Sequence, residues 1–274
     1  MAEIPDNVRI LIGAIYFVTC VIFTAVTVAV IAAILSCKKM RSSATYVIIL
    51  NILVTALLQL IIHGIGGAMA IVNGKVADWF EKLLGATIVN GWCTVHILAF
   101  SLALNRLAIF TNLPFVKEFK TMNATIALII FSWTCGFYFF TVLCLPDAGL
   151  RFFLENVEWD YEDLPLHWLL TQSERVIIAP AFAFTLIIYI VICCRIVWMQ
   201  KQTNPREIRL LIMAIVTFFN EALLFSIYQF GAFVLPDSPY SYVGANYHWI
   251  IEAPRMRQRC CVSTRSFANG LLTR

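Results

Sequence analysis

Long runs of residues without a charge dominate this sequence and limit what the chain can fold into. Five such runs are unbroken, and a sixth is interrupted only by Glu221. A helix that rises 1.5 Å per residue needs about 20 residues to cross the hydrocarbon core of a bilayer. The runs cover 10–37, 42–74, 83–105, 121–146, 176–194 and 210–236. The sequence therefore predicts an all-α membrane protein with six clear transmembrane helices and excludes a soluble fold.

The composition agrees with this fold class. Hydrophobic residues make up 61% of the chain and charged residues 13%, whereas soluble domains carry roughly 25% charged residues. The first run is much longer than the apolar core of a signal peptide, so we expect it to remain in the mature chain. We predict one receptor-like membrane domain over 1–251, with spans at about 10–37, 44–72, 84–110, 122–146, 176–199 and 209–235.

Basic residues indicate the orientation of the chain. If the N-terminus is extracellular, the connections after the first, third and fifth spans carry twice as many Lys and Arg residues as the opposite connections. Basic residues concentrate on the cytosolic side, so we predict that the N-terminus lies outside.

The C-terminal end breaks this pattern. A stub at 246–251 begins like another apolar span but stops at Glu252, and a basic tail follows at 252–274. After six spans this tail would lie on the wrong side. We interpret the stub as a truncated or replaced seventh helix, altered by an alternative exon, a frameshift or a gene-model error. The alternative is a genuine six-span protein. We expect the tail to be disordered.

The connection between the fourth and fifth spans, 147–175, is the longest on the outer side. It is rich in acidic residues, and aromatic residues lie among them. Long connections of this kind are often functional, and the aromatic residues favour a packed lid over an outer cavity. A merely solvated acidic loop is the alternative.

Enzyme signatures are absent from the sequence. It contains no HExxH, GxSxG or P-loop motif, and the cysteines are scattered without a CxxC pair that would suggest zinc. We therefore expect no enzyme activity, no cofactor, no metal site and no nucleic-acid partner.

Two neighbouring polar residues, Asn105 and Arg106, close the third span. An arginine at this boundary commonly anchors a helix end by extending its head to the interface. Alternatively, its planar guanidinium pairs with a neighbouring helix in one state and with a docking partner in another. The residues alone leave both interpretations open.

Other polar residues lie inside the predicted spans. Glu221, next to Asn220, carries a charge at a depth where insertion costs about 3 kcal/mol or more, which indicates either a functional group or a neutral structural one. A hydrogen bond from Asn51, His63 or His96 could relieve that cost. His96 lies in mid-span and either faces a cavity or packs in the core. We select His96, Asn220, Glu221 and Asn51 as candidates for a ligand pocket.

Proline and glycine residues bear on helix packing. Pro180 lies in the outer part of the fifth span, where the missing backbone hydrogen bond predicts a kink. Gly64, Gly66 and Gly67 in the second span permit close helix approach. Both features fit a bundle with an outward-facing pocket.

An ordered set of residues over 10–251 resembles the nematode serpentine chemoreceptors, seven-transmembrane G-protein-coupled receptors, of class X or a sister class. The residues are Asn51, Leu102–Arg106 (Leu-Ala-Leu-Asn-Arg), Trp133, Asn204–Arg209 (Asn-Pro-Arg-Glu-Ile-Arg) and Tyr247–Ile251 (Tyr-His-Trp-Ile-Ile).

The resemblance implies a rhodopsin-like bundle that binds a small environmental molecule from outside and signals to a heterotrimeric G protein in the cytosol. It also implies the plasma membrane of a sensory cilium. Asn105 and Arg106 would match the family's arginine motif, which contacts the G protein. Two features depart from the pattern. No cysteine in 147–175 can form the disulfide found in many rhodopsin-like receptors, and the Asn-Pro signature of the seventh helix is absent after Ile251.

Two other functions remain open at this point. A six-span transporter or channel would need a polar path, yet Glu221 is the only clear carboxylate within a span. A truncated receptor isoform that never signals is the other alternative.

Overall fold

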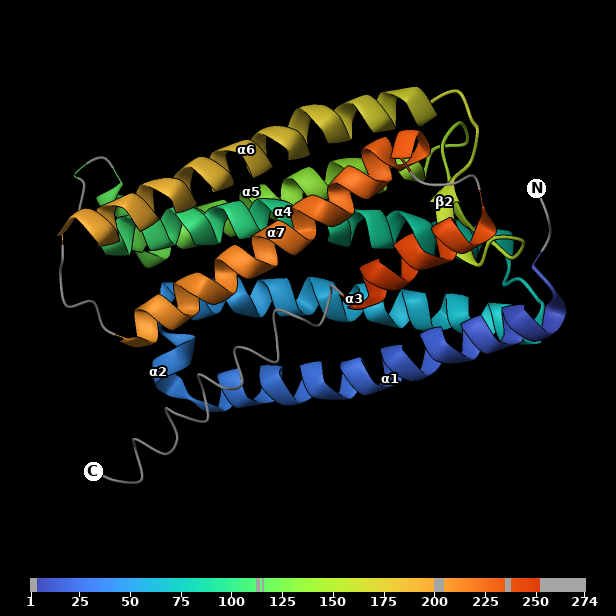
Figure 1. Ribbon diagram of the computed structural model, residues 1–274, viewed down its shortest axis with the longest axis horizontal. Helices are drawn as coiled ribbons and strands as arrows, with labels where there is room; N and C mark the ends of the chain where they lie inside the picture. Colours follow the sequence, from blue (N-terminus) through green and yellow to red (C-terminus); the bar gives the residue numbers. More distant parts are fainter. Residues whose placement is uncertain (1–3, 112–113, 115, 200–204, 235–237, 252–274) are drawn as a thin grey trace.

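A computed structural model describes residues 4–111, 114, 116–199, 205–234 and 238–251, which form a bundle of long helices with one small β-hairpin (Figure 1). The predicted tail at 252–274 lies outside the described residues. In chain order the elements are α1 (Asp6–Ser36), α2 (Lys38–Arg41), α3 (Ala44–Val72), α4 (Asp78–Thr111), η1 (Lys117–Lys120), α5 (Met122–Leu143), β1 (Leu150–Phe153), β2 (Glu158–Tyr161), α6 (His167–Met199) and α7 (Pro205–Val234). Residues 239–251 form a further helical segment, called the 239–251 helix below.

The outward faces of the bundle are apolar. Helices α1, α3, α4, α5 and α6 are each long and apolar enough to cross a membrane, and α7 contains a shorter apolar stretch, Phe218–Tyr228. Large apolar side chains are exposed along these helices, including Val18, Ile130, Phe131 and Ile187. Such surfaces suit lipid rather than water, and helices satisfy their own backbone groups there. The predicted all-α membrane fold is confirmed, with the hairpin as its addition.

Helix α4 forms the centre of the bundle. In its apolar window 67% of the residues are buried, against 22% in α1 and in α5. It packs against α3, α5, α6, α7, η1 and β1, so it is in contact with most elements of the bundle and with the hairpin.

Glycine allows α1 and α3 to approach closely. A Cβ atom placed on Gly67 would lie 2.9 Å from the carbonyl oxygen of Gly13, and one placed on Gly13 would lie 2.8 Å from that of Gly67. Any side chain at either position would push the helices apart. Gly67 therefore has the packing role expected from the sequence.

Helices α4 and α6 begin well before the predicted spans. Helix α4 starts at Asp78 rather than near residue 84, and α6 starts at His167 rather than near residue 176. The N-terminal part of each helix carries charged residues, Asp78 and Glu81 in α4 and Glu174 in α6, which end an uncharged run but do not end a helix. These added turns carry the contacts to the hairpin.

The 239–251 helix is longer than the expected stub at 246–251. Pro239 lies in its first turn, where a missing backbone N–H costs nothing. The segment packs beside α1 and α3: the Tyr16 hydroxyl donates to the carbonyl of Val243 at 2.8 Å, and Trp249 Nε1 donates to Gln59 Oε1 at 3.3 Å. Its described residues thus take the place of a seventh helix in the bundle (Figure 1).

Candidate functional site

The β-hairpin covers one end of the bundle, called the hairpin end below. Its strands pair antiparallel with Phe152 opposite Trp159. Glu162 N donates to Gly149 O at 3.0 Å, and hydrogen-bonded and non-bonded pairs alternate along such a ladder. The Phe152–Trp159 pair is therefore a non-bonded one, and the N–H of Phe152 points away from β2.

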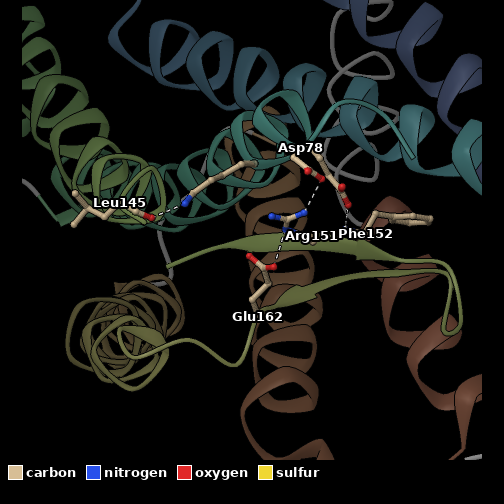
Figure 2. A network of polar contacts seen from close by, with 7 residues as sticks. Asp78, Leu145, Arg151, Phe152 and Glu162 are labelled. Atoms are coloured by element: carbon tan, nitrogen blue, oxygen red, sulfur yellow. Dashed lines mark hydrogen bonds and ion pairs between the residues drawn. The ribbon is translucent and has the colours of Figure 1, made fainter. Parts of the chain in front are cut away.

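A buried carboxylate on α4 accepts that N–H. Glu81 is 0% exposed, and its Oε1 lies 2.9 Å from the Phe152 nitrogen (Figure 2). In the same network Arg151 forms ion pairs with Asp78 at 3.0 Å and with Glu162 at 2.7 Å. Hydrogen bonds and ion pairs thus attach the hairpin to the start of α4.

This attachment is non-covalent. The loop has no cysteine, as the sequence indicated, and the cysteines of the described segments, Cys93 of α4 included, are free thiols. Close packing supports the polar contacts, because a Cβ atom on Gly85 would lie 2.0 Å from the carbonyl oxygen of Leu150. The hairpin backbone therefore rests directly on α4.

The hairpin buries two aromatic rings and one carboxyl group. The Phe152 and Trp159 rings meet edge to face with centroids 5.4 Å apart and cover Gly66 of α3, where a Cβ atom would come within 2.8 Å of a ring. Glu158, in the next position, is 5% exposed. Burial, with a smaller contribution from the Asp160 carboxylate, raises the pKa of Glu158 to about 8.

A cavity of about 170 Å³ lies beneath the hairpin. Its wall combines residues of the hairpin with residues of α4, α6, α7 and the 239–251 helix, so it has the capped position that the sequence predicted. The lining residues are Val89, Trp92, Leu150, Trp159, Asp160, Tyr161, His167, Thr171, Glu174, Arg175, Tyr228 and Trp249.

The cavity wall is aromatic and carries a buried carboxylate. Glu174 is 5% exposed and accepts a hydrogen bond from the Tyr161 hydroxyl. Burial and the neighbouring Glu174 carboxylate raise the pKa of Tyr161 well above its usual value, so the Tyr161 hydroxyl keeps its proton and remains a donor at neutral pH.

Trp249 joins the helices around the cavity. Besides its bond to Gln59, its ring meets His63 at 4.9 Å, Tyr228 at 5.5 Å and Trp92 at 6.2 Å. A single side chain of the 239–251 helix therefore contacts α3, α4 and α7.

Aromatic contacts continue from the cavity into the bundle. Trp92 meets Phe225 at 6.3 Å, and Phe225 meets Phe182 at 5.2 Å. Phe182 meets Phe218 at 5.7 Å, and Phe218 meets Tyr189 at 5.8 Å. This series of rings, called the aromatic column below, links α4, α6 and α7 along the bundle.

The polar pocket candidates lie outside the cavity wall. His96 is 5% exposed, with Nδ1 at 2.6 Å from the carbonyl of Trp92, and its ring packs on Phe182 at 5.0 Å. Glu221 is 6% exposed, while Asn220 donates to the carbonyl of Val216 at 2.9 Å. His96 is thus one layer behind the cavity, beside Trp92.

Asn51 is part of a helix-to-helix contact. Its Oδ1 accepts a hydrogen bond from Trp133 Nε1 at 3.1 Å, and its Nδ2 donates to the carbonyl of Val47 at 2.9 Å. The structure thereby brings together two residues of the family resemblance and joins α3 to α5. Pro180 lies inside α6, which runs on through it to Met199.

Asn105 and Arg106 lie toward the opposite end of α4, near η1. Asn105 accepts from the Thr45 hydroxyl at 2.7 Å and donates to the carbonyl of Phe119 at 2.9 Å. Arg106 is 2% exposed. The alternative of an arginine that extends its head to the interface is therefore wrong: this guanidinium is held inside the bundle.

Several residues of the site were missed from the sequence. Glu81 and Glu174 lie in helical turns that precede the uncharged runs, where charged residues indicate the end of a span rather than a site. Trp92, Tyr228 and Trp249 lie on apolar helices, where an aromatic residue looks like ordinary packing. The charged turns just outside spans three and five were the one usable signal.

Comparisons with known proteins agree with this architecture. Residues 17–234 match the family described as serpentine type 7TM GPCR chemoreceptor Srx. The fold matches squid rhodopsin with a TM-score of 0.79 at 14% sequence identity, over 98% of this chain and 85% of that one. No curated protein matches the chain in sequence. The family match covers most of the chain, which therefore belongs to the Srx family of serpentine seven-transmembrane chemoreceptors.

Proposed function

We propose that this chain is a chemosensory receptor of the plasma membrane that binds a small molecule in the cavity and signals to a heterotrimeric G protein at the opposite end of the bundle. The observation that carries the proposal is that α4 provides both Trp92 in the cavity wall and the buried Arg106. The hairpin end would face outside, at a sensory cilium by resemblance to the family.

The distribution of basic residues supports this orientation. Lys38, Lys39 and Arg41 in α2 and Lys117 and Lys120 in η1 gather at the end opposite the hairpin. Basic residues favour the cytosolic side. A G protein would then approach the end of the bundle that holds η1 and Arg106.

A ligand can act only by binding two arrangements of the bundle with different affinity. The cavity wall includes Trp92 of α4, Glu174 of α6 and Tyr228 of α7, so a ligand that touches all three is sensitive to how these helices sit against one another. The aromatic column would pass a shift of α6 or α7 toward Tyr189. Because Arg106 is 2% exposed in this arrangement, coupling requires an arrangement in which its guanidinium reaches the surface.

The test is the Arg106→Ala variant, expressed in cells that report second messengers and exposed to a panel of small volatile and water-soluble compounds. We expect normal surface delivery and loss of every response seen with the unmodified chain. Arg41→Ala, an exposed arginine at the same end, is the matched control and should respond normally. Arg106→Lys keeps the charge without the planar fork and should respond weakly. Responses preserved in Arg106→Ala would remove this residue from the mechanism.

A further inference from the structure

The cavity has the composition of a cation-binding site. The rings of Trp92, Trp159, Tyr161, Tyr228 and Trp249 all line it. Aromatic faces are electrically negative and attract organic cations, most strongly where water is excluded. Trp249 and Trp92 also lie close together in this wall, with ring centroids 6.2 Å apart and the rings steeply inclined to each other.

A carboxylate supplies the opposite charge. Glu174 lines the cavity and is 5% exposed. Its contact with the Tyr161 hydroxyl fixes the carboxylate against one of the rings of the wall. A buried carboxylate is costly unless a partner compensates it, and a positive ligand group would reduce that cost further.

The other charged groups of the wall are more exposed. Asp160 adds a second carboxylate, and its side chain is exposed, as is that of Arg175. His167 also lines the cavity, stacked on Tyr161 at 5.5 Å. The buried part of the wall thus combines rings with one negative charge, while the arginine lies where water screens it.

We propose that the ligand of this receptor is a small organic cation, an amine or a quaternary ammonium, whose charged head lies among the aromatic rings with Glu174 as its counter-ion. The inference rests on the proposed receptor function and deepens it by naming the ligand class. A carboxylate ligand would bring its charge beside Glu174, and a neutral ligand would offer the aromatic faces no positive charge.

The test compares probes that differ in charge but hardly in shape. The purified full chain in lipid nanodiscs is titrated with choline and its neutral carbon isostere 3,3-dimethylbutanol, and with phenethylamine, phenethyl alcohol and phenylacetate. The readout is saturable stabilisation against thermal unfolding. We expect the ammonium probes to stabilise the receptor and the neutral and anionic probes to have at least roughly tenfold weaker effects.

Glu174→Gln keeps the size of the side chain and removes its charge. It should weaken binding of the ammonium probes by roughly tenfold or more. Glu155→Gln is the matched control, an exposed carboxylate of the same hairpin that does not line the cavity, and it should bind as the unmodified chain does. The charge series on the unmodified chain decides the question even if the Glu174 variant fails to fold.

Equal binding of the neutral or anionic members, or no saturable effect of any ammonium probe, would overturn the inference. The two proposals fail separately. Ammonium binding without any G-protein response would contradict the proposed signalling and leave the ligand class intact. G-protein responses to neutral or anionic compounds alone would support the receptor function and refute the cationic ligand class.

Discussion

Replacing Glu81 with leucine removes the acceptor that holds the hairpin on α4 and introduces an apolar side chain of similar size. The carboxylate is 0% exposed and its Oε1 accepts the N–H of Phe152 at 2.9 Å. That N–H points away from β2, so the hairpin itself offers no substitute acceptor. In the Glu81→Leu variant it would stay buried without a partner unless the hairpin lifts.

The structure sets the size and the sign of the effect. A buried N–H left without an acceptor costs about 1–3 kcal/mol, which corresponds to roughly 5-fold to 150-fold more frequent opening of the hairpin. Removal of the buried carboxylate acts in the opposite direction, because an opened hairpin would let water reach that charge. Glu81→Gln separates the two contributions, since the amide oxygen can still accept the bond. We expect it to open within a few-fold of the unmodified rate.

Hydrogen exchange measured by mass spectrometry on peptides that cover residues 150–161 is the assay. Exchange should accelerate strongly in Glu81→Leu and little in Glu81→Gln. Asp78→Asn is the control, because the Asp78 side chain is 84% exposed and exposed ion pairs contribute about 1 kcal/mol or less. Slower or unchanged exchange in Glu81→Leu would show that desolvation of the carboxylate outweighs its hydrogen bond and would refute the role assigned to it.

Three further predictions concern Gly85, Trp133 and Glu158. Gly85→Ala places a Cβ atom 2.0 Å from the carbonyl oxygen of Leu150, so hydrogen exchange of the hairpin should rise; Gly74→Ala, where the nearest atom is 3.6 Å away, should leave it unchanged. Trp133→Phe loses the bond to Asn51 at 3.1 Å and should lower the free energy of unfolding by about 1 kcal/mol, seen as a lower melting temperature. Burial raises the pKa of Glu158 from 4.5 to about 8, so between these values the folded state holds a proton that the unfolded state has released, and stability falls as pH rises. Melting temperatures at about pH 5 and about pH 8.5 should therefore differ less in Glu158→Gln than in the unmodified chain; an equal difference in both would contradict the assignment.

Much of the fold could be predicted because lipid imposes a strong constraint on sequence. A spanning helix must be long and uncharged, so 44–72 was predicted with the bounds that α3 shows, Ala44–Val72. The N-terminal turns of α4 and α6 were not predicted, since they lie beyond the apolar run and contain charges such as Glu81 and Glu174. Hydropathy indicates which residues lie in the hydrocarbon core, whereas a helix can continue beyond that core wherever packing supports it.

The candidate site was harder to predict because it depends on contacts between distant residues. Trp249 meets Gln59 across 190 positions of sequence, and Asn51 meets Trp133 across 82. No short sequence motif indicates that such distant residues will be in contact. The sequence identified polar residues within apolar spans, which are easy to see, whereas the cavity is lined mainly by aromatic residues that resemble ordinary packing.

The burial of Arg106 was also beyond the sequence. An arginine at a span boundary suggests a head extended toward water, but Arg106 is 2% exposed, while its neighbour Asn105 is bonded to Thr45 and to the carbonyl of Phe119. The contact of Asn105 with η1 and the burial of Arg106 both arise from the tertiary fold.

The central claim is that ligand binding in the cavity activates a G protein through Arg106. Its most direct test measures guanine-nucleotide exchange on a heterotrimeric G protein, catalysed by the purified chain in nanodiscs. A compound that stabilises the chain by binding in the cavity should accelerate exchange, and Arg106→Ala should abolish this acceleration while the compound still binds. Acceleration that persists in Arg106→Ala, or saturation of the cavity by a compound with no exchange at all, would contradict this claim.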